Sequence, residues 1–132
     1  MTTGPFISIC GAPLAITWDV FAPTTTITFP THSTRIGLGA QTFNGGAGDK
    51  NGTSPVNRVE YAIQRQSDGL YWQGGTTWGS APSPMRSATL AGAPPNQTWS
   101  FSSPAFDGAD NGVSYVFYSR SCDSAGNTGV ND

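Results

Sequence analysis

The chain has 132 residues, of which 11% are charged and 11% aromatic, and its formal net charge is −2. This length allows one domain, the aromatic content is too high for a disordered tail, and six Lys and Arg residues are too few for a basic surface that binds nucleic acid. No apolar run approaches the ~18 residues of a membrane-spanning helix, so we expect no membrane insertion. Low charge with abundant Thr, Ser, Gly and Asn favours an extracellular or cell-surface location.

Short β-branched and aromatic segments separated by turn residues follow one another along the chain, and helical periodicity is nearly absent. The pattern predicts strands at residues 24–29, 36–43, 56–66, 70–73, 85–90, 98–102 and 113–122. Residues 44–54 are predicted to form a polar loop, and Ser67-Asp68-Gly69 a tight turn. Evenly spaced short strands of this kind predict an all-β fold, a β-sandwich.

Four segments carry recognisable motifs. Residues 19–28 (DVFAPTTTIT) contain D-x-x-A-P before a strand, and residues 69–78 (GLYWQGGTTW) form a Tyr-Trp hairpin pattern. Residues 115–122 (YVFYSRSC) form a late strand, which a D-x-A-G-N turn at 123–127 follows. Over about residues 19–128 the chain thereby resembles the immunoglobulin-like repeats of large bacterial surface proteins and adhesins. The resemblance implies an immunoglobulin-like sandwich that acts as a passive spacer or adhesive module.

The two ends of the chain depart from this family. In the repeats a last strand follows the D-x-A-G-N turn, whereas residues 128–132 are too short for a turn and a strand of about 5–6 residues. Before Asp19, residues 6–10 and 14–18 have strand patterns on either side of Gly11-Ala12-Pro13. We therefore expect residues 1–22 to be a donor strand with its linker, and residues 23–132 to be a sandwich domain without its own last strand.

The linker limits where the N-terminal strand can go. The resemblance implies that the last strand ends at the opposite end of the sandwich from the start of the first strand. Residues 20–23 reach at most about 14 Å, whereas a sandwich is about 30 Å long. We therefore predict head-to-tail strand donation between copies, which makes a homopolymer and gives the chain the role of a filament or pilus subunit. The predicted donor side chains are Phe6, Ile7, Ile9, Leu14, Ile16 and Trp18. The predicted acceptor side chains are Val113, Tyr115, Phe117 and Ser119.

The two cysteines allow three interpretations. Antiparallel pairing of the donor with residues 113–122 would place Cys10 beside Cys122, so a disulfide would join neighbouring subunits. An intrachain disulfide and two buried thiols are the alternatives.

No residue pattern predicts catalysis, and no cofactor is implied apart from calcium. Asp19, Asp123 and Asn127, with Asp107 and Asp110, are candidate calcium ligands because Ca²⁺ binds clustered oxygen atoms. Asp and Asn are also ordinary turn formers, and we favour that interpretation.

A surface glycan is a further candidate partner, because Tyr71, Trp72 and Trp78 could stack on sugar rings. This would make the domain a carbohydrate-binding module. Packing of the two tryptophans into the sandwich or onto the hairpin is the interpretation that we favour.

Overall fold

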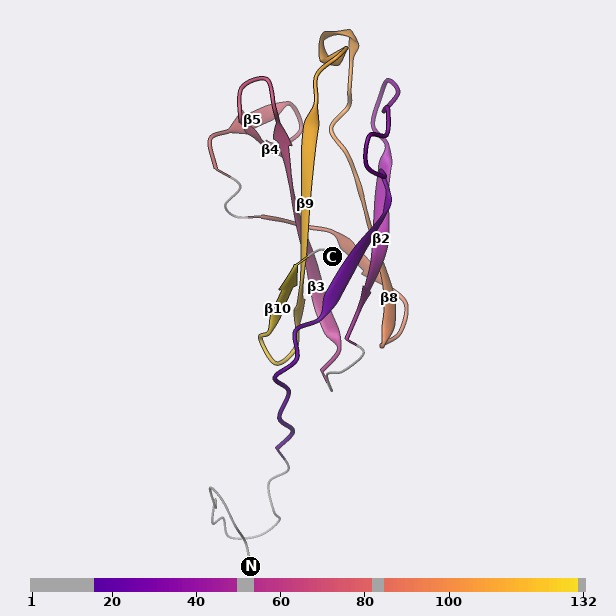
Figure 1. The fold of residues 1–132 in the computed structure, drawn as a ribbon, viewed down its shortest axis with the longest axis vertical. Helices are drawn as coiled ribbons and strands as arrows, with labels where there is room; N and C mark the ends of the chain where they lie inside the picture. The colour runs from indigo at the N-terminus through magenta and orange to yellow at the C-terminus, as the bar shows by residue number, and fades with distance from the viewer. Residues whose placement is uncertain (1–15, 50–53, 82–84, 131–132) are drawn as a thin grey trace, which may run out of the picture.

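Figure 1 shows the fold in the computed structural model, which describes residues 16–49, 54–81 and 85–130. Two antiparallel sheets form the domain. The first contains, in spatial order, β1 (Thr24–Phe29), β2 (Thr42–Gly48), β8 (Asn96–Ser102) and β7 (Thr89–Ala91). The second contains β10 (Thr128–Val130), β9 (Tyr115–Asp123), β3 (Val56–Arg65), β4 (Tyr71–Gly74) and β5 (Thr77–Gly79), with β6 (Arg86–Ser87) paired to β3. The predicted all-β fold is confirmed, and the two sheets are consistent with a β-sandwich.

An aromatic cluster packs the two sheets together. The first sheet contributes Phe43, Trp99 and Phe101, and the second contributes Tyr61 and Phe117. The centroid of the Phe117 ring lies 5.8 Å from that of Phe43, 5.9 Å from that of Trp99 and 5.7 Å from that of Phe101. Rings at these separations dominate the burial energy of a core, because each removes ~150–250 Å² from water. Phe117 of β9 therefore packs against the aromatic side chains of the first sheet.

The predicted strand at residues 56–66 corresponds to β3, Val56–Arg65. Val59, Tyr61 and Ile63 of β3 are buried, and Arg58 and Glu60 lie on the other face. The strand predicted at 85–90 is instead two short strands, because β6 pairs with β3 whereas β7 pairs with β8. The chain therefore crosses from one sheet to the other within this segment.

The predicted positions of the second strand and of the following loop are wrong. Residues 44–48 belong to β2 and not to a loop, and residues 36–41 precede the strand. Trp99 is the physical reason, because its Nε1 donates a hydrogen bond to the Gly46 carbonyl at 3.1 Å. A Cβ atom on Gly45 would overlap both the Trp99 ring and the Thr26 carbonyl. Glycine is needed in this strand because a large ring covers it.

The expectation that the chain lacks its own last strand is wrong in part. β10 follows the D-x-A-G-N turn and pairs antiparallel with residues 120–122 of β9. It passes so close to the first sheet that a Cβ atom on Gly129 would overlap the Pro23 carbonyl. β10 covers three residues of the nine-residue strand β9.

The two ends of the sandwich differ. The segment that precedes β1 leaves the domain at the end where the turn between β9 and β10 lies, which we call the β10 end (Figure 1). The loop between β1 and β2 and the loop before β9 lie at the opposite end, which we call the loop end (Figure 1). β9 spans the distance between them.

The packing of Trp99 on β2 gives a first prediction. Gly45→Ala should lower the free energy of unfolding by about 2–3 kcal/mol, because the added methyl group overlaps a backbone oxygen and a buried ring. Gly37→Ala is the matched control, since a Cβ atom there meets nothing within 4 Å. Urea unfolding followed by tryptophan fluorescence measures both, and equal stability of the two variants would contradict the packing described.

Candidate functional site

One edge of β9 is only partly paired. On its inner side, β3 pairs with β9 from Val56 opposite Asp123 to Arg65 opposite Tyr115. On its other side, β10 covers residues 120–122. Within the described part of the chain, no strand pairs with residues 115–119 on that side, which we call the open edge. The N–H and C=O groups along such an edge form a template for a further strand.

A groove of about 1510 Å³ lies beside the open edge, towards the loop end. It runs between β1 and the following loop on one side and residues 106–117 on the other. Its main apolar lining residues are Ile27, Ile36, Leu38, Phe43, Phe106 and Phe117. Of the predicted acceptor side chains, Val113, Tyr115 and Phe117 line this groove, and Ser119 lies buried further along β9. The loop residues were not predicted, because only tertiary contacts such as the bridge between Gly39 and Phe106 place them here.

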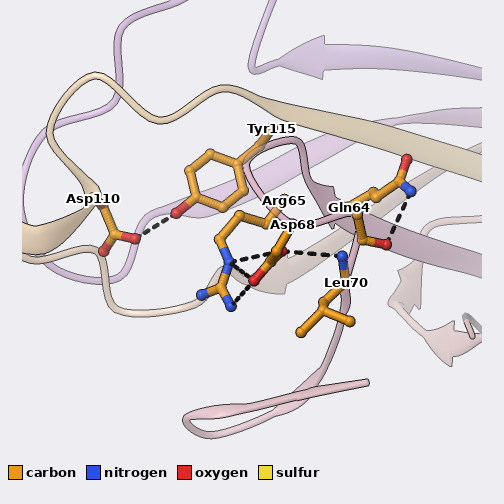
Figure 2. A network of polar contacts seen from close by, with 7 residues as sticks. Gln64, Arg65, Asp68, Leu70, Asp110 and Tyr115 are labelled. Carbon is orange, nitrogen blue, oxygen red and sulfur yellow. Dashed lines mark hydrogen bonds and ion pairs between the residues drawn. The ribbon is translucent and has the colours of Figure 1, made fainter. Parts of the chain in front are cut away.

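Polar contacts fix the mouth of the groove at the loop end (Figure 2). The Tyr115 hydroxyl donates a hydrogen bond to Asp110, which also accepts the Asp107 N–H at 2.8 Å. On the neighbouring strand, Arg65 makes an ion pair with Asp68 at 2.6 Å and lies over the ring of Trp78, 4.3 Å from its centroid. The hydrogen bond to Asp110 therefore holds the Tyr115 side chain in place at this end of the groove.

Both partners of the Tyr115–Asp110 hydrogen bond have shifted pKa values. Burial and the contact with Asp110 raise the pKa of Tyr115 far above its usual 10.0, so the hydroxyl remains a donor. The hydrogen bonds from Tyr115 and from the Asp107 N–H lower the pKa of Asp110 below its usual 3.8. Asp110 is therefore ionised at neutral pH and serves as a charged acceptor.

The predicted calcium candidates fall into two groups. Asp107 and Asp110 lie at the 3₁₀ helix Gly108–Asp110, where each accepts a backbone N–H and together they form a capping box. Asp19, Asp123 and Asn127 meet at the β10 end, where Asn127 Nδ2 donates to the Asp19 carbonyl at 3.1 Å and to Asp123 Oδ2 at 2.9 Å.

Asp49 is an additional carboxylate at the β10 end, which the sequence analysis missed because it follows a run of glycines. Single oxygen atoms of Asp19, Asp49 and Asp123 lie within 4.8 Å of one another, a donor set that Ca²⁺ could use. Asp123 Oδ1 already accepts the N–H groups of Ala125 and Asn127, at 2.9 and 2.8 Å. We therefore assign Asp123 to the turn, the interpretation favoured from the sequence.

Asp19 fixes the start of the N-terminal segment. Its Oδ2 accepts the Ser54 N–H at 2.7 Å, and its carbonyl accepts the amide of Asn127. The side chains around it are exposed: Ile16 by 57%, Trp18 by 77% and Val20 by 76%. Four apolar residues within six positions, counting Phe21, present an apolar surface at the β10 end. The other predicted donor residues, Phe6, Ile7, Ile9 and Leu14, lie outside the described residues.

Cys122 is a buried thiol in the single chain. Its Sγ lies 3.7 Å from Thr128 Oγ1, and Thr128 occupies the pairing position opposite Cys122. Cys10 lies outside the described residues, so its predicted pairing with Cys122 stays a prediction.

The predicted sugar platform is mostly covered. Trp72 is buried, donates its Nε1 hydrogen to the Gly75 carbonyl at 3.0 Å, and lies beneath the guanidinium of Arg86 at 4.8 Å. Arg65 covers Trp78 in the same way. These tryptophans pack against the sandwich, as favoured from the sequence.

No protein-family model matches the chain, and a search of the curated proteins finds no match. The resemblance to immunoglobulin-like repeats therefore stays a prediction. Among the described residues, no helix has the length and apolar character needed to cross a membrane.

The turn held by the buried Asp123 carboxylate gives a second prediction. Asp123→Ala should lower the free energy of unfolding by about 2–4 kcal/mol, because it leaves two backbone N–H groups without their buried acceptor. Asp68→Ala, in an exposed turn, should have a much smaller effect. Thermal unfolding measures both, and an equal loss in the two variants would contradict the role given to Asp123.

The Tyr115–Asp110 hydrogen bond gives a third prediction. Tyr115→Phe should lower the free energy of unfolding by about 1 kcal/mol at neutral pH. The pKa of Asp110 is lower in the folded protein than in the unfolded chain. The hydrogen bond therefore contributes fully to stability at pH values above the pKa of Asp110 in the unfolded chain. Its contribution is lost as the pH falls through the pKa of Asp110 in the folded protein. The stability difference between the wild type and the variant should therefore narrow below about pH 4. A difference that is constant between neutral and acidic pH would contradict the charged hydrogen bond.

Proposed function

We propose that this protein is a structural subunit of an extracellular filament, in which each copy donates its N-terminal strand to the next copy. One observation carries the proposal. The same chain has an open sheet edge beside an apolar groove near the loop end and an exposed apolar segment at the β10 end. Each copy therefore offers one strand and has one place for a strand.

Strand addition would satisfy both features. A strand along residues 115–119 would pair the N–H and C=O groups of the open edge, and its apolar side chains would enter the groove beside Phe117. Because the donating and accepting surfaces differ and lie at opposite ends of the domain, the contact repeats without closing on itself and gives a filament.

The anchoring of Asp19 supports donation between copies rather than within one copy. A strand antiparallel to β9, the direction that β10 takes, would end near Tyr115. Asp19 is bonded to Asn127 at the opposite end of β9, about 26 Å away along eight strand intervals. Trp18 is covalently joined to Asp19 and cannot reach the Tyr115 level of its own copy.

The extracellular location is part of the proposal and is supported by composition, with 11% charged residues. A spacer or adhesive repeat would place a strand of the same polypeptide, continuing beyond Val130, along the open edge. Such a protein would be a monomer with a filled groove, so its state of assembly separates the two functions.

Assembly of the purified chain is the fourth prediction. Negative-stain electron microscopy and size-exclusion chromatography of the wild type should show filaments. Ile16→Asp should weaken association at least about 100-fold, because an unpaired carboxylate would be buried in an apolar groove. Ile16 is exposed in the single copy, so the variant should fold normally.

Thr17→Asp is the matched control, since it adds the same charge at the next position, on the other face of a strand. It should assemble like the wild type. A wild type that remains monomeric, or an Ile16→Asp variant that assembles as well as Thr17→Asp, would contradict the proposed function.

A further inference from the structure

The boundary between β10 and the open edge fixes the register of the donated strand. We propose that residues 14–18 of one copy, and not the whole segment 6–18, pair antiparallel with residues 115–119 of the next copy. Trp18 then lies opposite Tyr115, and the pairing continues residue by residue to Leu14 opposite Ser119. This inference rests on the proposed function, and it names the partner segment and the pairing that the groove accepts.

β10 sets the length of the pairing. In the described part of the chain, β10 pairs with residues 120–122 of β9 on this side, so the edge that remains for a second strand is residues 115–119. In the donor, Pro13 precedes Leu14 and has no N–H to give to a ladder, so pairing begins after it. Asp19 is bonded to its own copy, so pairing ends before it. Five donor residues remain for five acceptor residues.

The alternation of side chains selects the same register. Tyr115 and Phe117 face the core of the acceptor, whereas Val116 and Tyr118 are exposed on the outer face. Leu14, Ile16 and Trp18 alternate with Ala15 and Thr17 in the donor. Residues directly opposite one another share a face of the sheet, so the proposed register places Ile16 and Trp18 in the groove and Leu14 on the same core-facing side, opposite Ser119. A shift by one residue would turn all of them towards solvent.

This register separates the two cysteines. Placing Cys10 opposite Cys122 and continuing residue by residue would set Ile16 opposite the exposed Val116. It would also require the position that Thr128 occupies beside Cys122. The inference therefore predicts that assembly does not need a disulfide between Cys10 and Cys122.

Disulfide trapping between copies tests the register and is the fifth prediction. In a full-length Cys10→Ser, Cys122→Ser background, Thr17→Cys with Val116→Cys should form a covalent ladder on a non-reducing gel after oxidation of the assembled protein. Thr17 lies on the outer face in the proposed register. Val116 borders the groove but is itself exposed, so its substitution leaves the core-facing Tyr115 and Phe117 unchanged. Opposed Cβ atoms lie ~4.5–5.5 Å apart, near the separation that a disulfide spans.

The control pairs differ only in register. Ala15→Cys with Tyr118→Cys is also opposed in the proposed pairing and should form the ladder. Thr17→Cys with Tyr118→Cys is displaced by two residues, ~7–8 Å apart, and should form several-fold less.

Each other outcome overturns the inference in a distinguishable way. A stronger ladder from the displaced pair, or filaments without a ladder from any pair, would refute the register and leave strand donation standing. Filaments in the wild type but not in the single variant Cys10→Ser would show that assembly needs the Cys10 thiol and would contradict the register. Cross-links within single monomers, or a wild type that does not assemble, would refute both the register and the proposed function.

Discussion

The hydrogen bonds that hold Asp19 at the β10 end are the constraint on which the functional account depends. They fix the point at which the N-terminal segment leaves the domain, while the open edge of β9 lies towards the other end. A strand has a direction as well as a position, and β10 shows which direction this edge accepts. The chain can therefore offer its apolar segment to a second copy but cannot place it antiparallel on itself.

The aromatic core makes a groove of this kind possible. The rings of Phe43, Trp99 and Phe101 in the other sheet hold Phe117. β9 therefore keeps its place, although no strand of the described residues pairs with residues 115–119 on its outer side. Tyr115 is held at the mouth of the groove by Asp110. An acceptor that is ordered before binding loses less conformational entropy when a strand enters, which favours association.

The sequence predicted those parts of the fold that depend on local alternation. β3 and β9 were found because their buried and exposed residues alternate over many positions. β2 was misplaced because its glycine-rich half has no alternation of its own. The position of this strand depends on packing against Trp99, more than fifty residues later in the chain. β10 was missed because three residues carry too little pattern, and its place depends on the turn that the buried Asp123 holds. In the site, Tyr115 and Phe117 followed from alternation, whereas Leu38 and Asp49 depend on tertiary contacts that no local pattern contains.

The most direct measurement is a structure of the assembled protein by cryo-electron microscopy, traced well enough to assign the strand beside residues 115–119 to a chain. The account predicts residues 14–18 of a neighbouring copy, running antiparallel to β9, with Ile16 beside Phe117. Residues from the same copy along that edge, whether N-terminal or following β10, would contradict it.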